Sequence, residues 1–285
     1  MNPDGSISWR QLWDDTAVSE GRARARWLCE EASGMFGHEF TDVLDRLVTE
    51  RSIAHLDAML VRLAQGEPLQ YVLGHWSFRG LDLMVDRRVL IPRPETEWVA
   101  EVAIELARTL PRPLLAADLG TGSGALGLSL VAELPRGAAE VWLTDVSPDA
   151  LDVARANAAG LGIAGGGARF AHGSWFGALP HHVRGALGLV VSNPPYIAPG
   201  DPAVDESVHE WEPHGALYSG ADGLDAVREI IAAAPGWLQP AGWLVLEIGT
   251  GQGVAVASLL GDAGFGEVEI RHDLAGHDRV AIGRR

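Results

Sequence analysis

An asparagine, two prolines and a tyrosine follow directly on an apolar run in the second half of the chain. The run is LGLVV at 187–191, and the segment SNPPYIAP continues it over 192–199. Proline fixes φ and lacks a backbone N–H, so Pro194 and Pro195 cannot continue a central sheet ladder, although both keep their carbonyl acceptors. The segment therefore offers acceptors and an aromatic ring, held stiffly at the carboxyl end of a predicted buried strand.

This combination suits the presentation of a planar amino group to an electrophile. An amide nitrogen is a poor nucleophile because its lone pair is delocalised into the carbonyl, and no side chain deprotonates it near neutral pH. The Asn193 side-chain oxygen and the Pro194 carbonyl can instead accept its two N–H bonds, while the Tyr196 ring packs on the planar group. Such positioning accounts for roughly 7–11 kcal/mol of a barrier, and acceptors aimed at the developing positive charge add to it. We therefore predict catalytic roles for Asn193, Pro194 and Tyr196, and substrate contacts for these residues and Pro195.

A glycine-rich turn supplies the second chemical feature. The stretch DLGTGSG at 118–124 ends an apolar run and directly precedes a predicted helix. Its glycines permit a tight turn and a close approach of the backbone to a ligand, and the helix adds unpaired N–H groups. Asp145 follows about 20 residues later, where an acid that binds ribose hydroxyls is expected. The pattern predicts a nucleoside site made of this turn and Asp145.

The identity of the nucleoside stays open on these residues alone. Gly122, Gly124 and Gly127 also satisfy the G-x-G-x-x-G pattern of dinucleotide binding, so NAD is an alternative. S-adenosylmethionine (AdoMet) has no pyrophosphate to place at the helix end, but it carries an ammonium group that Asp118 can help hold. The SNPPY segment favours AdoMet, because methyl transfer to a planar NH₂ group uses two acceptors and a ring, whereas hydride transfer does not.

The elements around both features alternate between strand and helix. We predict helices at 125–133, 148–159, 223–234 and 254–263, and strands at 114–119, 140–144, 168–171, 187–192, 242–248, 267–272 and 279–282. Continuous apolar strands that alternate with helices indicate an α/β fold with a mostly parallel sheet, covered on both faces. In such sheets the ligand lies beyond the carboxyl ends of the strands. The last two strands have no helix between them, so we expect one of them to be antiparallel.

The preceding residues read as a helical bundle and a strand pair. Short helices are expected between about 8 and 65 from apolar residues at helical spacing. One of the expected helix faces consists of Val43, Leu44, Leu47 and Val48. Period-two alternation around Leu83 predicts the strand pair. We therefore expect three parts, a helical substrate-recognition domain at 1–75, a hairpin linker at 76–95 and a catalytic domain at 96–285.

Composition limits the partners and the compartment. The 285 residues carry a net charge of −16 and contain no lysine, so the chain is a poor general binder of nucleic-acid phosphates. One cysteine excludes an internal disulfide and a thiolate metal cluster, which favours a reducing cytoplasm. No apolar run is long enough to span a bilayer, and the N-terminal stretch lacks the features of a signal peptide. His181 and His182 have no third ligand nearby, so we expect no metal.

At these motifs the sequence resembles AdoMet-dependent methyltransferases that act on planar amino groups and share the motif (N/D/S)PP(Y/F). They include DNA adenine and cytosine amino-methyltransferases, some RNA guanine methyltransferases and protein glutamine N5-methyltransferases. Longer stretches make the chain most similar to the peptide chain release factor glutamine methyltransferase family (HemK/PrmC). These are GEPLQYVLGHWSFRGLDLMVDRRVLIPRPETE, DLGTGSGALGLSL, TDVSPDALDVARANA, GSWFGALP, VSNPPYIAP and LAGHDRVAIGR. The similarity runs from about residue 66 to the end of the chain.

The resemblance implies a fold, an activity and a partner. The fold is Rossmann-like, the class I methyltransferase α/β fold with a mixed seven-stranded sheet, preceded by a small helical bundle and a β-hairpin linker. The activity is transfer of a methyl group from AdoMet, giving S-adenosylhomocysteine. The acceptor is N5 of the glutamine in the Gly-Gly-Gln motif of class-1 peptide chain release factors. We expect a cytoplasmic monomer that binds neither membrane nor nucleic acid directly.

The resemblance also assigns residues. The family's ribose acid falls on Asp145, and Asn193 would also lie near the cofactor methyl group. The aromatic residue after the third strand falls on Trp175, which would pack near adenine, although taken alone it reads as a core tryptophan. Arg93 would line the substrate side. The family's cofactor loop falls on Gly120, Thr121, Gly122, Ser123 and Gly124.

Three other functions remain as alternatives. A DNA or RNA amino-methyltransferase would use the same NPPY chemistry, but it needs a basic surface that a net charge of −16 disfavours. A non-catalytic nucleoside-binding module is disfavoured by the intact Asn193 and Asp145. An NAD oxidoreductase is disfavoured by NPPY and by the lack of an acid or base suited to hydride transfer. The segment 200–213 is acidic where family members vary, which leaves the docking of the substrate open.

Overall fold

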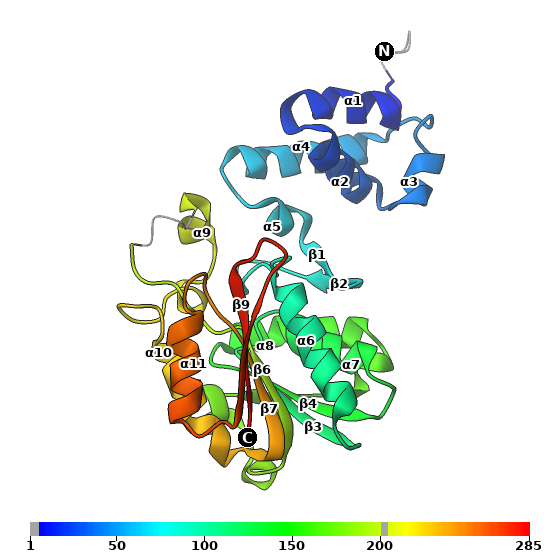
Figure 1. Ribbon diagram of the computed structural model, residues 1–285. Coiled ribbons are helices and arrows are strands. Elements are labelled where there is room, and N and C mark those ends of the chain that lie inside the picture. The colour runs from blue at the N-terminus through cyan, green and yellow to red at the C-terminus, as the bar shows by residue number, and fades with distance from the viewer. Residues whose placement is uncertain (1–5, 201–204) are drawn as a thin grey trace. The chain divides into compact units, whose positions relative to one another are not determined.

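The computed structural model describes residues 6–200 and 205–285 (Figure 1). The chain divides into two compact units between His75 and Trp76, and each unit is described by itself. Within the acidic segment 200–213, residues 201–204 lie outside the described residues.

The N-terminal unit is helical, as the apolar spacing predicts. Its helices are α1 (Trp9–Glu20), α2 (Arg22–Ser33), α3 (His38–Asp42), α4 (Glu50–Ala64) and α5 (Leu69–Leu73). A capping box begins α1, since Ser8 Oγ accepts the N–H of Gln11 and Gln11 Oε1 accepts the N–H of Ser8. Leu28, Phe40 and Leu56 are buried between these helices and form the centre of the unit's core.

The helix predicted around residues 43–48 is wrong. Helix α3 ends at Asp42, and the chain then runs beside the start of α1. The carbonyls of Leu44 and Arg46 accept the N–H groups of Arg10 and Trp9, and the N–H of Val48 donates to Ile7. These long-range hydrogen bonds replace the helical ones that the local apolar pattern suggested.

A β-hairpin follows at the expected place. Its strands are β1 (His75–Phe78) and β2 (Leu81–Met84), and the turn between them contains Arg79. The Arg79 guanidinium lies 2.6 Å from Glu133 and 2.7 Å from Glu101, so it ties the turn to helices α6 (Thr96–Thr109) and α7 (Ala125–Glu133). The hairpin is therefore anchored on the C-terminal unit.

The C-terminal unit is built on a seven-stranded mixed sheet in the order β5-β4-β3-β6-β7-β9-β8. Strand β9 is antiparallel to both of its neighbours, β7 and β8, which confirms the expectation of one antiparallel strand. The remaining pairings are parallel. The strands are β3 (Leu114–Leu119), β4 (Ala139–Asp145), β5 (Ala168–His172), β6 (Leu187–Ser192), β7 (Leu238–Glu247), β8 (Glu267–His272) and β9 (Asp278–Arg284).

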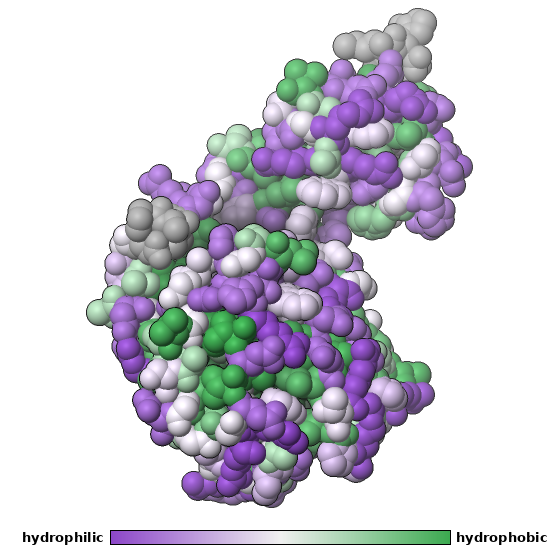
Figure 2. Space-filling view, viewed as in Figure 1, coloured by the Kyte–Doolittle hydropathy of each residue, from purple (hydrophilic) through white to green (hydrophobic). Residues whose placement is uncertain are grey.

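Helices cover both faces of this sheet (Figure 1). One core joins Ala116 of β3 to α6, α7 and α8 (Pro148–Gly160), and the other joins Ala117 to α10 (Asp225–Ala233) and α11 (Gly253–Asp262). Neighbouring residues of one strand thus face opposite cores, because side chains alternate along a strand. Much of the visible outer surface is hydrophilic, with hydrophobic groups between (Figure 2). The sequence did not predict the short helix α9 (Glu206–Trp211) in the acidic segment.

The strand order fixes where a ligand can lie. The chain proceeds from β3 to β4 and β5 on one side, and then returns to place β6 on the other side of β3. Helix connections leave on opposite faces at such a point and open a crevice beyond the strand carboxyl ends. Leu119 pairs with Ser192 there, so the glycine-rich turn and the SNPPY segment begin side by side. Within residues 6–200 and 205–285, none of the helices has the length and apolar character needed to cross a bilayer.

Candidate active site

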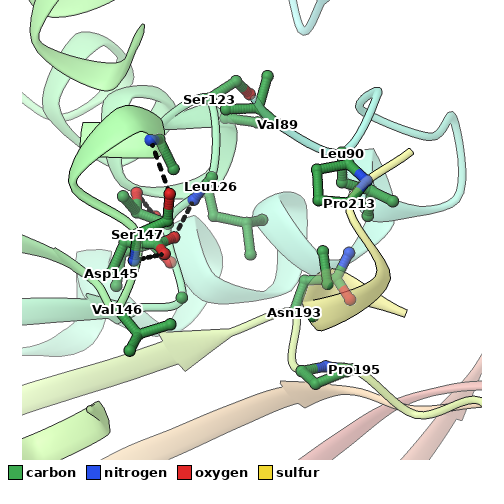
Figure 3. A pocket seen from close by; sticks show the side chains of 18 of the residues that line it. Val89, Leu90, Ser123, Leu126, Asp145, Val146, Ser147, Asn193, Pro195 and Pro213 are labelled. Atoms are coloured by element: carbon green, nitrogen blue, oxygen red, sulfur yellow. Dashed lines mark hydrogen bonds between the residues drawn. The ribbon is translucent and has the colours of Figure 1, made fainter. Parts of the chain in front are cut away.

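A cavity of about 280 Å³ opens beyond the carboxyl ends of β3, β4 and β6. Figure 3 shows Asp145 and Ser147 on one side of it and Asn193 and Pro195 on the other. The residues predicted from sequence that line it are Asp118, Gly120, Thr121, Gly122, Ser123, Asp145, Trp175, Asn193 and Pro195. The fold therefore brings most of the glycine-rich turn and two residues of the SNPPY segment, Asn193 and Pro195, to one space.

The two carboxylate oxygens of Asp118 have different surroundings. Its Oδ2 accepts hydrogen bonds from Thr121 Oγ1 at 2.6 Å and from the N–H of Gly127 at 2.8 Å. Its Oδ1 is buried and has no hydrogen-bond partner among the described residues. Burial raises the pKa of Asp118 to about 6, although the two hydrogen bonds oppose the rise. A buried, unpartnered carboxylate oxygen on a residue that lines the cavity suits a cationic donor such as an ammonium group.

Asp145 is held by the backbone of two loops. Its Oδ2 accepts the N–H of Gly122 and its Oδ1 accepts the N–H of Ser147, each at 2.9 Å. Burial raises the pKa of this carboxyl, while the same N–H groups oppose the rise. Each oxygen has a second lone pair, so a carboxylate fixed in this way can still accept bonds from a diol. This is the arrangement that the sequence predicts for a ribose.

The glycine-rich turn leaves room for an aromatic ring. Gly120, Gly122 and Gly124 all have positive φ, which other residues adopt only with strain. A methyl group on Gly120 would lie 3.2 Å from the Trp175 ring. Trp175 is half-buried, packs against one sheet core and lines the cavity, so it is both a packing residue and a candidate for the adenine contact. Gly124 does not line the cavity, and its assignment as a cofactor contact stays a prediction.

Asn193 lines the cavity opposite Asp145, and one end of its side-chain amide is already engaged. Its Nδ2 donates to the hydroxyl of Thr96 at 3.3 Å. Thr96 is the first residue of α6, is 3% exposed and lines the same cavity. Because the nitrogen is used in this bond, the amide oxygen Oδ1 is left as an acceptor for a ligand.

The remaining predicted residues surround the cavity without lining it. Pro194 is buried, and the Tyr196 hydroxyl donates to Glu247 Oε1 at 3.1 Å. Arg93 forms an ion pair with Glu212, whose Oε2 also accepts the N–H of Ile91 at 3.1 Å. The roles of Pro194, Tyr196 and Arg93 toward the substrate stay predictions.

Two residues that hydrogen bond to the SNPPY segment, Thr96 and Glu247, escaped the sequence reasoning. Thr96 belongs to the IPRPETE stretch, in which the resemblance led only to Arg93. Glu247 ends the apolar run LVLE, and a carboxylate at the end of a buried strand was a signal that could have been used. Among the described residues, no group of three or more His, Cys, Asp and Glu side chains is placed to hold a metal ion.

Comparison with known proteins finds relatives over most of the chain. The "PrmC N-terminal domain" family matches residues 9–74, and the "Methyltransferase small domain" family matches residues 103–210. A release factor glutamine methyltransferase of Vibrio cholerae is 41% identical over 84% of this chain and 81% of its own length. The protein of the same name from Burkholderia pseudomallei is 42% identical over 91% of this chain and 90% of its own length.

A solved structure supports the fold. It is a 16S rRNA N2 G1207 methyltransferase of Thermus thermophilus in complex with AdoMet and guanosine, with a TM-score of 0.53 and 19% identity. The match covers 74% of this chain and 49% of that one. At this identity it supports a shared fold and nothing further. The class I methyltransferase fold is therefore present, and the identity to the curated relatives extends over most of the chain. This chain belongs to the release factor glutamine methyltransferase family.

Proposed function

We propose that the protein transfers the methyl group of AdoMet to the side-chain amide nitrogen of the glutamine in the Gly-Gly-Gln motif of class-1 peptide chain release factors. The observation that carries the proposal is the Asn193 side chain, which lines the cavity with its nitrogen bonded to Thr96 and its oxygen left as an acceptor. The names of the relatives, which specify a glutamine and a release factor, support this acceptor. We propose that the protein acts as a cytoplasmic monomer of 30.3 kDa.

The cavity fits AdoMet better than a dinucleotide. The unpartnered Asp118 Oδ1 suits the ammonium group, and Asp145 suits the ribose hydroxyls. The Trp175 ring, packed over Gly120, offers a flat surface to adenine. The bound cofactor would supply an electrophilic methyl group on a sulfonium sulfur, and two buried acids beside the cavity favour such a cation.

The chain's own residues would then align the acceptor nitrogen. Asn193 Oδ1 and the Pro194 carbonyl would accept the two N–H bonds of the substrate amide. Both oxygens favour the transition state, because positive charge develops on the nitrogen as the new N–C bond forms. One N–H proton leaves after the transfer, so no base has to remove it from the neutral amide. The rate enhancement comes from positioning and electrostatics.

We also propose roles for the parts of the chain. Residues 1–75 would recognise the release factor, and residues 96–285 would carry out the transfer. The hairpin segment 76–95 would connect the two. The Arg79 ion pairs with Glu101 and Glu133 hold the hairpin on the catalytic part, so it can act as a firm point of attachment.

The test is transfer of a labelled methyl group from AdoMet to a purified class-1 release factor, followed by mass spectrometry of the Gly-Gly-Gln peptide. We expect one methyl group on the glutamine side chain, and no label when this glutamine is replaced by alanine. Label that persists on the alanine variant would overturn the proposed acceptor. Equal labelling of duplex DNA or of RNA in parallel reactions would favour a nucleic-acid amino-methyltransferase instead.

A further inference from the structure

A glutamine connects the SNPPY segment to the loop after β7, and the steps described above do not use it. Gln252 is half-buried and lies directly before α11. Its Oε1 accepts the N–H of Gly249 at 2.8 Å, and its Nε2 donates to the carbonyl of Tyr196 at 3.1 Å. A backbone N–H can only donate and a carbonyl can only accept, so these two partners fix the orientation of the amide.

Two glycines make room for this contact. A Cβ on Gly249 would lie 3.0 Å from Gln252 Oε1 and 3.2 Å from the Tyr196 ring. A Cβ on Gly223 would overlap the Tyr196 carbonyl oxygen, and the positive φ of Gly223 also favours glycine. The backbone on both sides is therefore shaped so that the Gln252 amide can reach Tyr196.

The Gln252 side chain serves Tyr196 rather than the helix that it precedes. It occupies the N-cap position of α11, but its Oε1 accepts from Gly249 behind it. The N–H of Gly253, at the start of the helix, donates instead to Asp278 Oδ2 of β9 at 2.9 Å. Replacing the Gln252 side chain should therefore leave the start of α11 in place.

The SNPPY segment is stiff, but its position depends on how its two ends are held. Ser192 is held in the sheet, where its Oγ donates to the carbonyl of Leu119 at 2.6 Å. Pro194 and Pro195 have fixed φ and no N–H, so few torsions are free between the sheet and Tyr196. Holding the Tyr196 carbonyl therefore restricts both the Pro194 carbonyl and Pro195, which lines the cavity.

We propose that Gln252 is a positioning residue for methyl transfer, whose side-chain NH₂ holds the Tyr196 carbonyl and so fixes the far end of the SNPPY segment. The acceptors that this segment presents are thereby kept in line with the methyl donor. The proposal rests on the proposed function, because the position of these acceptors matters only when they hold a substrate amide. Gln252 acts through Tyr196 and needs no contact of its own with the substrate.

The first part of the test is the steady-state kinetics of Gln252→Ala with the release factor as substrate. We expect kcat to fall roughly tenfold, because the Tyr196 carbonyl loses its donor and the segment its second anchor. The AdoMet Kd should stay within about threefold, since Asp145 and the Asn193 segment lie on different sides of the cavity (Figure 3). Measuring both quantities on one preparation shows that the cofactor site is still folded.

The sharpest variant is Gln252→Glu, which keeps the shape of the side chain. A protonated carboxyl has one O–H donor and one carbonyl acceptor, so it reproduces both hydrogen bonds of the amide. An ionised carboxylate only accepts, so it would repel the Tyr196 carbonyl. At saturating AdoMet, kcat relative to the wild-type protein should rise at least about fivefold as the pH falls from 8 to 5. The relative kcat of Gln252→Ala should not change with pH.

The charged groups around the loop favour this pH range. The titratable side chains that bond to residues 247–253 are Tyr196, Asp278 and Arg279, and Glu247 lies within the segment. The two acids and the facing carbonyl should raise the pKa of a carboxyl introduced at position 252, while Arg279 opposes the rise.

Matched controls separate the contact from the chemical change itself. Gln239→Glu adds the same acid near the opposite end of β7 and should leave kcat unchanged at each pH. Gly249→Ala places a methyl group between Gln252 and Tyr196 without a positive φ, and it should lower kcat as Gln252→Ala does. Gly261→Ala is its control, because the added Cβ meets nothing within 4 Å.

A second readout does not need the release factor. Because the pKa of the introduced carboxyl is raised on folding, its protonated form favours the folded state. The free energy of unfolding of Gln252→Glu, relative to the wild-type protein, should therefore fall as the pH rises from 5 to 8. Urea unfolding measures this fall, and Gln239→Glu should show no comparable one.

The outcomes separate the inference from the function on which it rests. Wild-type kcat in Gln252→Ala would overturn the positioning role and show that the bonds of Ile197 to Leu217 and Ser219 hold the segment. A relative kcat of Gln252→Glu that does not change with pH, or an AdoMet Kd that weakens as much as kcat falls, would also overturn it. A wild-type enzyme that does not methylate the release factor would overturn the proposed function, and the inference with it, whatever the unfolding of Gln252→Glu shows.

Discussion

The guanidinium of Arg93 pairs with the carboxylate of Glu212, a side chain that is only 2% exposed although it lies 119 positions further along the chain. The same carboxylate accepts the N–H of Ile91. The pair therefore joins the loop before α6 to the segment after α9, and the neighbouring residues Pro92 and Pro213 line the cavity. This ion pair holds two walls of the site together, whatever contact Arg93 makes with the substrate.

Replacing Arg93 should destabilise the two cavity walls that its ion pair with Glu212 joins. We expect Arg93→Met to lower the free energy of unfolding by about 3 kcal/mol, because it leaves the buried Glu212 carboxylate without its cation. The variant Arg93→Met/Glu212→Gln should regain part of this loss, since no unpaired charge remains. Urea unfolding of both variants, with release-factor KM measured beside it, is the check. Equal losses in the single and double variants would show that the pair does not support the wall.

The space between Gly120 and Trp175 should be sensitive to a single methyl group. Gly120→Ala adds a Cβ that meets the ring at 3.2 Å, at a φ of 70° that alanine adopts only with strain. We expect the AdoMet Kd to rise about tenfold and the free energy of unfolding to fall by roughly 1–2 kcal/mol. Gly160→Ala is the matched control, because its Cβ meets nothing within 4 Å and its φ is not positive. Calorimetric titration with AdoMet that gave equal affinities for both variants would refute the close fit.

Ionisation of Asp118 should lower the stability of the folded protein and strengthen the binding of the cofactor. Its pKa is about 6 in the folded protein against 3.8 ordinarily, so folding favours its protonated form. The folded state therefore loses stability as the pH rises from about 4 through 6, by about 3 kcal/mol in all. Asp118→Asn should raise the free energy of unfolding at pH 8 and leave it nearly unchanged at pH 4.

The affinity for AdoMet should rise as the pH rises, whereas the stability of the folded state falls. Only the ionised carboxylate attracts the ammonium group, so wild-type AdoMet affinity should weaken as the pH falls through about 6. Asp118→Asn should bind at least about tenfold more weakly at pH 8 and lack this pH dependence. Urea unfolding at pH 4 and 8 tests the predicted stability, and calorimetric titration with AdoMet at the same two pH values tests the predicted affinity. A variant that binds AdoMet as tightly as the wild-type protein would show that Oδ1 is not the ammonium partner.

The sequence predicts the catalytic half of the fold well because its signals are local. Each buried strand is a continuous apolar run, and the carboxyl ends of parallel strands meet at one edge. Asp118, Asp145 and Asn193 each stand at a strand end or directly after one, so knowing the strands was enough to bring them together. The positive φ of the glycines in the turn is also a local signal, because glycine adopts positive φ without strain.

The features that were missed depend on contacts between distant segments. Residues 43–48 leave the helical state because the start of α1 offers their backbone hydrogen bonds. Asn157 was predicted only as part of a helix, yet its amide binds the backbone of Met84 and the carbonyl of Ser123, which links the hairpin to the glycine-rich turn. Thr96 lies 97 positions from Asn193, and no local pattern pairs them.

The account depends most on Asn193 as the group that holds the substrate amide. The most direct test is the release-factor methylation rate of Asn193→Ala, measured with its AdoMet affinity on the same preparation. We expect kcat to fall at least about a hundredfold, because an aligned acceptor is lost, while the AdoMet Kd stays within about threefold. An Asn193→Ala protein that methylates the glutamine at the wild-type rate would contradict the account, as would one whose slow turnover is restored by saturating AdoMet.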